Sequence, residues 1–139
     1  MDVLATTPGN TEELEIWDYK GSTKVEGDSR EMKNYEFQMR VYAELYKQKV
    51  GKYPVRAVLC FLAEESLADM TVEIKFDEVS TATAMKTFVA TVAEIEARRE
   101  KGDWSPPAVA PSVKTCGACD IRWDCTTAKK AYKFSMPRP

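Results

Sequence analysis

Apolar and polar residues alternate near the start of the chain, and this alternation predicts a β-hairpin. We expect a strand over Asp2 to Thr6, a turn over residues 7–10, and a second strand over Leu14 to Lys20. Side chains on a strand point alternately to its two faces. One face of the second strand therefore carries Leu14, Ile16, Asp18 and Lys20, and the other carries Glu15, Trp17 and Tyr19.

Two longer segments repeat apolar residues every three or four positions, a period typical of amphipathic helices. The first predicted helix runs from about Asn34 to Lys49, and the second from about Val79 or Ser80 to Lys101. The inward face of the first comprises Tyr35, Gln38, Met39, Tyr42, Leu45 and Tyr46. The inner stripe of the second comprises Met85, Phe88, Val92 and Ile95.

Between the two helices, the pattern predicts a buried strand over Arg56 to Ala63 and an outer strand over Thr71 to Phe76. Hairpin, helix, two strands and helix in this order predict an α/β (α+β) fold, in which helices flank a mixed central β-sheet. The composition changes at Trp104, where prolines lead into three cysteines and a basic tail. We therefore expect a core over residues 1–103 and a small cysteine module over residues 104–139.

The composition is that of a globular chain. Its 139 residues are 44% hydrophobic and 30% charged, and this length corresponds to about one domain. The longest apolar run, Ala57 to Ala63, is far shorter than the ~20 residues that cross a bilayer. The N-terminus has no signal-peptide pattern, so we expect a soluble, cytoplasmic protein with no membrane partner.

Two features of the charged and polar residues narrow the chemistry. The sequence has no histidine, which excludes Ser/His and Cys/His nucleophile pairs and metal sites that use imidazole. The net charge of −2 gives no overall basic field of the kind that many nucleic-acid-binding proteins carry. Residues 1–33 hold eight acidic and four basic residues, whereas residues 114–139 hold two acidic and six basic ones. This asymmetry is compatible with a cation site in the first segment and phosphate contacts in the last.

The second predicted strand ends in Asp18-Tyr19-Lys20, a carboxylate and an ammonium two residues apart. On a strand, this spacing points both side chains to the same face, roughly 7 Å apart along the chain. Mg²⁺ prefers carboxylate oxygens, and a neighbouring lysine can position a water or stabilise charge on a phosphate oxygen. The same two residues would also suit a salt bridge on the surface of an edge strand.

Gln38 is a polar residue on the otherwise apolar face of the first predicted helix, near Tyr35, Met39 and Tyr42. A buried amide without hydrogen bonds costs ~1–3 kcal/mol, so we expect Gln38 to face a polar partner. That partner is either a functional group or, alternatively, a helix end or the sheet backbone.

Three cysteines form a Cys116-x2-Cys119-x5-Cys125 pattern. In a cytosolic chain, such spacing is more typical of soft-metal ligands than of disulfides. Zinc and [4Fe–4S] sites normally have four protein ligands. The remaining cysteine, Cys60, lies within the apolar predicted strand, and we assign it to the core as a small hydrophobic residue.

In their order and spacing, these motifs resemble those of the RecB-like branch of the PD-(D/E)XK nucleases. The chain looks most like the iron–sulfur members, the AddB and CRISPR-associated RecB-like exonucleases. The resemblance implies a restriction-endonuclease-like core and extends from Asp2 to Cys125. It rests on the run from Leu14 to Lys20, on Gln38-x3-Tyr42 and on the three-cysteine pattern.

The resemblance implies a role for each matching residue. Asp2 and Asp18 would ligate one or two Mg²⁺ or Mn²⁺ ions, with the main-chain carbonyl of Tyr19 as a third ligand. Lys20 would orient the attacking water or stabilise the developing charge. Gln38 and Tyr42 would help to bind DNA and to organise the catalytic lysine. The [4Fe–4S] ligands, or zinc ligands, would be Cys116, Cys119 and Cys125.

The sequence departs from the family pattern in its first residues. Family members carry an N-terminal helical region with a further cysteine, and often an active-site histidine, ahead of the position that Asp2 matches. This sequence begins one residue before Asp2 and has no histidine. We therefore expect the C-terminal part of a longer nuclease, with the fourth cluster ligand on the missing part.

The leading hypothesis is a metal-dependent DNA nuclease, a RecB-like exonuclease that hydrolyses phosphodiester bonds. Its expected partners are DNA and a helicase or another recombination or CRISPR subunit. The alternative is a non-catalytic nucleic-acid-binding or scaffold domain with a structural metal or iron–sulfur site. Such a domain would contact phosphates through Lys114, Arg122, Lys129, Lys130 and Lys133.

Overall fold

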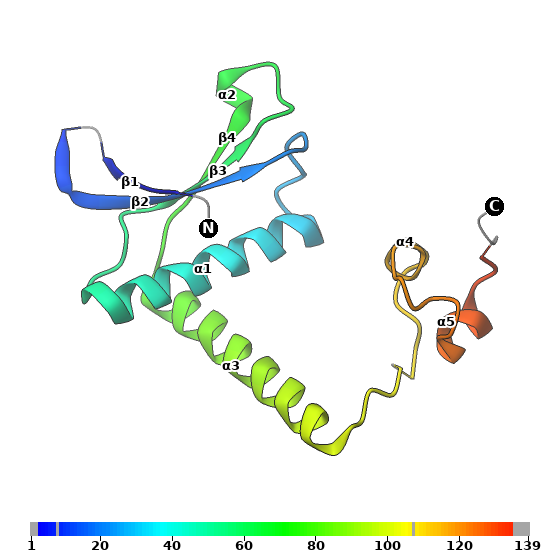
Figure 1. The fold of residues 1–139 in the computed structure, drawn as a ribbon. Coiled ribbons are helices and arrows are strands. Elements are labelled where there is room, and N and C mark those ends of the chain that lie inside the picture. The colour runs from blue at the N-terminus through cyan, green and yellow to red at the C-terminus, as the bar shows by residue number, and fades with distance from the viewer. Residues whose placement is uncertain (1–2, 8, 107, 135–139) are drawn as a thin grey trace. The chain divides into compact units, whose positions relative to one another are not determined.

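The computed structural model describes residues 3–7, 9–106 and 108–134. The chain forms two compact units, Met1–Ala93 and Glu94–Pro139. Figure 1 shows the sheet and its helices in the first unit and short helices in the second. The long helix α3 (Glu78–Lys101) contains the boundary between the units.

The first unit contains a four-stranded mixed sheet in the order β1-β2-β3-β4. Strands β1 (Val3–Thr7) and β2 (Asn10–Lys20) form an antiparallel hairpin, and β3 (Ala57–Phe61) runs parallel to β2. Strand β4 (Thr71–Ile74) pairs antiparallel with β3 and follows a short helix, α2 (Leu67–Met70), that the sequence pattern does not predict. The predicted mixed sheet flanked by helices is confirmed.

A long crossover connects the two parallel strands, because a tight turn cannot join them. Its main element is helix α1 (Arg30–Val50), which starts four residues before the predicted Asn34. The Ser29 hydroxyl caps the helix by accepting a hydrogen bond from the Met32 amide at 3.1 Å. At the other end Gly51 adopts φ 87°, a left-handed conformation that ends many helices.

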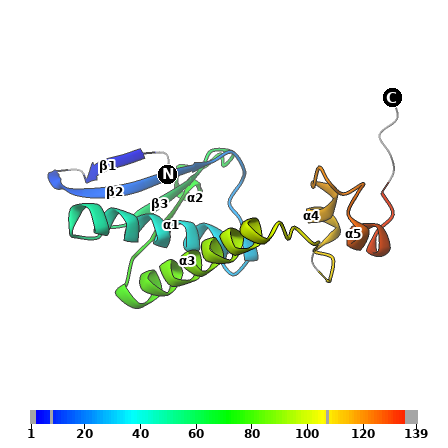
Figure 2. The same ribbon diagram turned by 60° about the horizontal axis from the view of Figure 1, so that its bottom comes forward.

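Helix α1 covers one face of the sheet, as both ribbon views show (Figures 1 and 2). Strand β3 is buried at all five positions. The core between helix and sheet comprises Ile16, Met32, Met39, Ala43, Ala57, Leu59, Phe61 and Ile74. One predicted inward residue of α1, Leu45, is instead exposed, because the buried face of the helix is centred on Met39 and Ala43.

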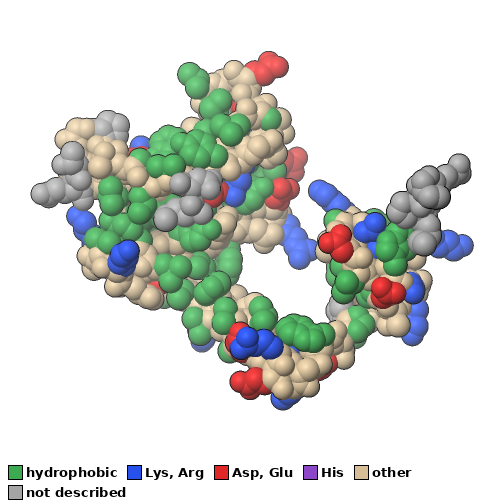
Figure 3. Space-filling model, in the orientation of Figure 1, with side chains coloured by type: hydrophobic (Ala, Val, Ile, Leu, Met, Phe, Trp, Pro, Cys, Tyr) green, Lys and Arg blue, Asp and Glu red, His purple; other side chains and the backbone are tan. Residues whose placement is uncertain are grey.

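The predicted inner stripe of the second helix is wrong for most of its length. In α3 the buried residues are Thr81 and Ala84, whereas Phe88, Val92 and Ile95 are between 38% and 47% exposed. Both buried residues belong to the first two turns of the helix, and the later apolar residues lie on its exposed surface in the described structure. Hydrophobic side chains are visible along the surface of this helix, with charged ones near its end (Figure 3).

The second unit contains two short helices, α4 (Val113–Gly117) and α5 (Thr126–Ala131). The Ser112 hydroxyl caps α4 through the Thr115 amide at 3.1 Å. The Tyr132 hydroxyl donates a hydrogen bond to the Pro111 carbonyl at 2.6 Å and thereby ties the end of α5 to the segment before α4. Within the described part of the chain, no helix is long and apolar enough to cross a membrane.

Candidate active site

The end of strand β2 places two charged side chains on the face that α1 covers. The predicted alternation is confirmed: Ile16 is fully buried and Asp18 is 3% exposed, whereas Tyr19 on the other face is 42% exposed. The Lys20 side chain is 15% exposed and ion-paired with the Asp18 carboxylate. Because taking charges out of water is costly, such a pair needs further polar partners, and a surface salt bridge does not describe it.

Helix α1 supplies those partners through Gln38 and Tyr42, which lie one turn apart. The Lys20 ammonium donates a hydrogen bond to Gln38 Oε1 at 3.3 Å, and Gln38 Nε2 donates one to the Tyr42 hydroxyl at 3.0 Å. An ammonium can only donate, so these contacts fix which end of the amide faces the lysine. The alternative of a helix-end or sheet-backbone partner for Gln38 is therefore wrong. Asp18, Lys20, Gln38 and Tyr42 form one connected polar chain.

The structure adds Tyr35, a residue that the sequence pattern assigns only to the apolar face of the helix. The Lys20 ammonium lies 4.2 Å from the centroid of its ring, within the range of a cation–π interaction. The Tyr35 hydroxyl donates a hydrogen bond to Glu31 at 2.8 Å. Burial raises the pKa of this hydroxyl above its usual range, and the Glu31 and Asp18 carboxylates raise it further. The spacing places Tyr35 on the same helix face as Gln38, three residues earlier, but it does not distinguish a ring that contacts Lys20 from an ordinary core residue.

A second buried carboxylate, Glu15, lies on the opposite face of β2 and belongs to a separate network. Glu15 is 2% exposed and pairs with Arg56, whose Nε donates a hydrogen bond to it at 2.9 Å. The Trp17 indole N–H donates to the same carboxylate at 3.0 Å, and Arg56 also pairs with Glu73. These contacts raise the pKa of Arg56, chiefly through Glu73 and Glu15. The network joins β2 to β4 through Arg56, the residue before β3, and its described contacts do not include the Lys20 site.

The residues of this site lie within a stretch of the chain that matches a known protein family. A family model of the PD-(D/E)XK nuclease superfamily matches residues 1–126. The chain belongs to this superfamily. No curated protein and no solved structure gave a significant match. PD-(D/E)XK proteins are generally metal-dependent nucleases, so the polar chain at the end of β2 is the candidate active site.

The donor groups at this site fit a hard divalent cation, which PD-(D/E)XK nucleases typically use. Asp18 contributes a buried carboxylate. Ile16 and Lys20 direct backbone groups to the β3 side, where they bond Arg56 and Leu62. Because these directions alternate along a strand, the Tyr19 carbonyl points to the β1 side. Mg²⁺ is commonly held by one or two carboxylates and keeps several waters.

The third predicted ligand, Asp2, lies outside the described residues. The described part of β1 begins at Val3, which pairs with Trp17. Among the described residues, no group of three or more acidic or cysteine side chains is placed to hold a metal ion. The metal-ligand roles of Asp2, Asp18 and Tyr19 therefore stay predictions.

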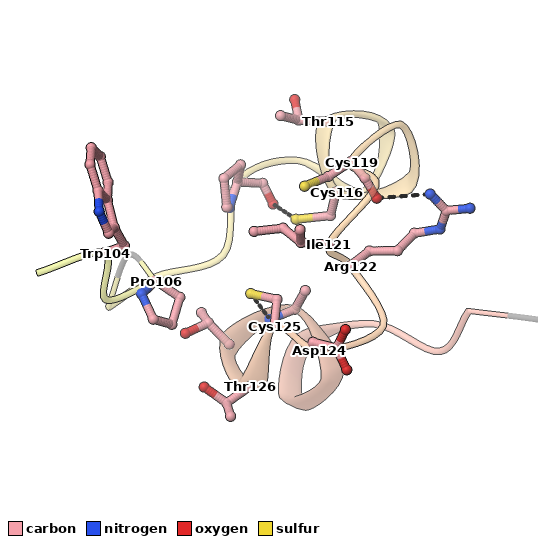
Figure 4. Close-up of a pocket in the computed structure, with 13 residues that line it drawn as sticks. Trp104, Pro106, Thr115, Cys116, Cys119, Ile121, Arg122, Asp124, Cys125 and Thr126 are labelled. Atoms are coloured by element: carbon pink, nitrogen blue, oxygen red, sulfur yellow. Dashed lines mark hydrogen bonds between the residues drawn. The ribbon is translucent and has the colours of Figure 1, made fainter. Parts of the chain in front are cut away.

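The three predicted cluster ligands line one pocket of about 440 Å³ in the second unit (Figure 4). Cys116 belongs to α4 and is 6% exposed, Cys119 follows that helix, and Cys125 precedes α5. The Cys125 sulfur accepts a hydrogen bond from the Ala128 amide at 3.4 Å. Thiols have the right chemistry for a soft metal, but the described side chains do not gather three of them around one point. The binding of a metal cluster by these cysteines therefore stays a prediction.

The fourth cysteine of the chain is part of the core, as predicted. Cys60 lies on β3 and is 5% exposed. It belongs to the first unit, whereas the pocket with the other three cysteines belongs to the second.

Proposed function

We propose that this chain is a metal-dependent DNA nuclease of the RecB-like exonuclease type, which hydrolyses phosphodiester bonds. The observation that carries the proposal is the position of the Lys20 ammonium. It lies between the Asp18 carboxylate and the Gln38 amide, at the end of a strand in a PD-(D/E)XK protein. We propose the same roles for Asp2, Asp18, Lys20, Gln38 and Tyr42 as the sequence resemblance implies.

Asp18, the Tyr19 carbonyl and Asp2 would hold Mg²⁺ or Mn²⁺. When bound, such an ion would polarise a phosphate oxygen and lower the pKa of a water molecule. Its requirement for oxygen ligands agrees with the buried carboxylate on β2.

Lys20 is the chain's own electrostatic contribution to the reaction. A lysine ammonium has three N–H donors, and two of them face Asp18 and Gln38. The third is available to a phosphate oxygen or to the attacking water, where a fixed positive charge stabilises the charge that develops in the transition state. Gln38 and Tyr42 limit the directions that the ammonium can take.

The cysteine module would add a second cofactor. We propose that Cys116, Cys119 and Cys125 bind a [4Fe–4S] cluster or zinc, on the basis of their soft-metal chemistry and their common pocket. Because the described sulfurs do not surround one point, their binding would require the module to rearrange. The expected macromolecular partners are DNA and a helicase or another recombination or CRISPR subunit.

The proposal is tested by incubating the purified chain with end-labelled single- and double-stranded DNA, with Mg²⁺ or Mn²⁺ and with a chelator. We expect cleavage that needs the added metal and that falls by about 100-fold or more in Lys20→Ala, a typical cost of removing an electrostatic stabiliser. Cleavage that persists in the chelator would contradict the proposal. DNA binding without cleavage in either protein would support the non-catalytic binding domain instead.

A further inference from the structure

We propose that Tyr35 is a positioning residue of the active site, whose ring holds the Lys20 ammonium in its reactive direction. This inference rests on the proposed nuclease function and deepens it. Tyr35 is not one of the residues that the sequence motifs assign to the site. The ring lies 4.2 Å from the ammonium nitrogen.

The Tyr35 ring is itself held against the core. It contacts the Phe61 ring, with the centroids 6.2 Å apart and the planes at 59°, and Phe61 is fully buried. Phe61 is also the register partner of Lys20 across the parallel strand pair. The Tyr35 ring therefore contacts the side chains of two residues that are paired across the strands, Lys20 and Phe61.

The Tyr35 hydroxyl gives the ring a second fixed point. It donates a hydrogen bond to Glu31, one turn earlier in α1. Because the pKa of the hydroxyl is raised, the phenol stays protonated and the ring uncharged at neutral pH. An uncharged ring attracts the ammonium through its electron-rich face without accepting its proton.

An aromatic ring is a useful partner here because its face attracts the ammonium without taking up a strong hydrogen bond from it. Lys20 is ion-paired with the Asp18 carboxylate and donates a hydrogen bond to Gln38 Oε1. An aromatic face is a weak acceptor, and so a phosphate oxygen or water can take the third N–H while the cation stays over the ring. The carboxylate of Asp18 is also a predicted metal ligand, whereas the attraction of the ring does not depend on that carboxylate.

The test compares Tyr35→Leu, which removes the ring, with Tyr35→Phe, which keeps the ring and removes the hydroxyl. On DNA with Mn²⁺, we expect Tyr35→Leu to lower kcat about 10- to 100-fold with little change in KM, because misplacing a catalytic group costs rate more than binding. Tyr35→Phe should retain most of the kcat of the unmodified protein. Equal kcat values for Tyr35→Leu and the unmodified protein would overturn the proposal.

A second measurement does not depend on activity. In protein labelled with ¹³C at the lysine ε carbons, an ammonium side chain above an aromatic ring gives ε-proton signals shifted upfield. Lys47 also lies over a ring, 4.3 Å from the centroid of Tyr53, so we expect at least two such cross-peaks. The Lys20 cross-peak is the one that is absent in Lys20→Ala, is retained in Tyr35→Phe and moves to the ordinary lysine position in Tyr35→Leu, whereas the Lys47 cross-peak stays in all three variants. A Lys20 signal at the ordinary position in the unmodified protein would overturn the proposal even if Tyr35→Leu failed to fold.

The two measurements separate this inference from the proposed function. An upfield Lys20 signal that depends on Tyr35, in a protein that does not cleave DNA, would confirm the contact between the ring and Lys20. It would contradict the proposed nuclease function. DNA cleavage that depends on Lys20 but has the same rate in Tyr35→Leu would support the nuclease function and contradict the positioning role of Tyr35.

Discussion

The Lys20 ammonium donates a hydrogen bond to Gln38 Oε1 at 3.3 Å, although the two residues are 18 positions apart in the sequence. This contact joins the last residue of β2 to the middle of α1. It also connects two of the three motifs that the family resemblance rests on, because Gln38 in turn donates a hydrogen bond to Tyr42. The amide therefore links the ammonium to the helix.

Replacing Gln38 by leucine should reduce catalysis without unfolding the chain. The substitution removes the amide oxygen that accepts a hydrogen bond from Lys20, and a hydrogen bond to a charged group contributes ~1.5–3 kcal/mol. We expect kcat on DNA to fall about tenfold or more. Gln48→Leu, an exposed change near the end of the same helix, is the matched control and should cleave as the unmodified protein does. Equal rates for the two variants would show that Gln38 has no part in the reaction.

Replacing Asp18 by asparagine should affect both stability and metal binding. The change leaves the partly buried Lys20 charge without its ion-pair partner. Breaking a buried pair by removing one member costs on the order of 3 kcal/mol. Urea unfolding should show this loss, while Asp28→Asn in an exposed loop should leave the free energy of unfolding nearly unchanged. Titration of Mn²⁺ should also show weaker binding to Asp18→Asn; unchanged affinity would contradict the ligand role.

The network on the opposite face of the sheet should matter for stability but not for cleavage. Arg56→Leu would leave the Glu15 carboxylate, which is 2% exposed, without its cation. We expect the free energy of unfolding to fall by on the order of 3 kcal/mol. Arg99→Leu breaks an exposed pair with Glu96 and should cost less than about 1 kcal/mol. A loss for Arg56→Leu no larger than that for Arg99→Leu would mean that the Glu15 network does not stabilise the sheet.

The cysteine module should reveal its cofactor when the protein is prepared without oxygen. We expect iron in the purified chain, reduced in Cys116→Ala, and slower amide exchange over residues 108–134 when iron is bound than after chelation. The Cys60→Ala variant should keep its iron, because Cys60 belongs to the sheet. Protein that contains neither iron nor zinc under these conditions would refute the cluster.

The pair at the end of β2 could be predicted because strand alternation is a local property. The period of two places Asp18 and Lys20 on the face of Ile16, and the structure confirms this side. The polar partner of Gln38 could also be predicted, since a buried amide must be hydrogen-bonded. The identity of that partner came from the family resemblance and not from the pattern.

Other features depend on contacts that no local pattern contains. Glu15 is buried because Arg56, 41 positions away, neutralises it. The ring of Tyr35 follows the same period as core residues, so its contact with the Lys20 ammonium has no separate signal in the sequence. In α3, periodicity shows an apolar stripe that includes Phe88 and Val92, but not whether a core lies opposite it. The early start of α1 depends on the single cap at Ser29.

The most direct measurement of the central claim is the rate of metal-dependent DNA cleavage by Lys20→Ala and Lys75→Ala, prepared and assayed side by side. Lys75 is 86% exposed and has no contact with the site in the described structure, so its loss controls for one positive charge. We predict that Lys75→Ala cleaves at the rate of the unmodified chain and that Lys20→Ala cleaves about 100-fold or more slowly. Equal cleavage by both variants would contradict the account, because the activity would then come from elsewhere.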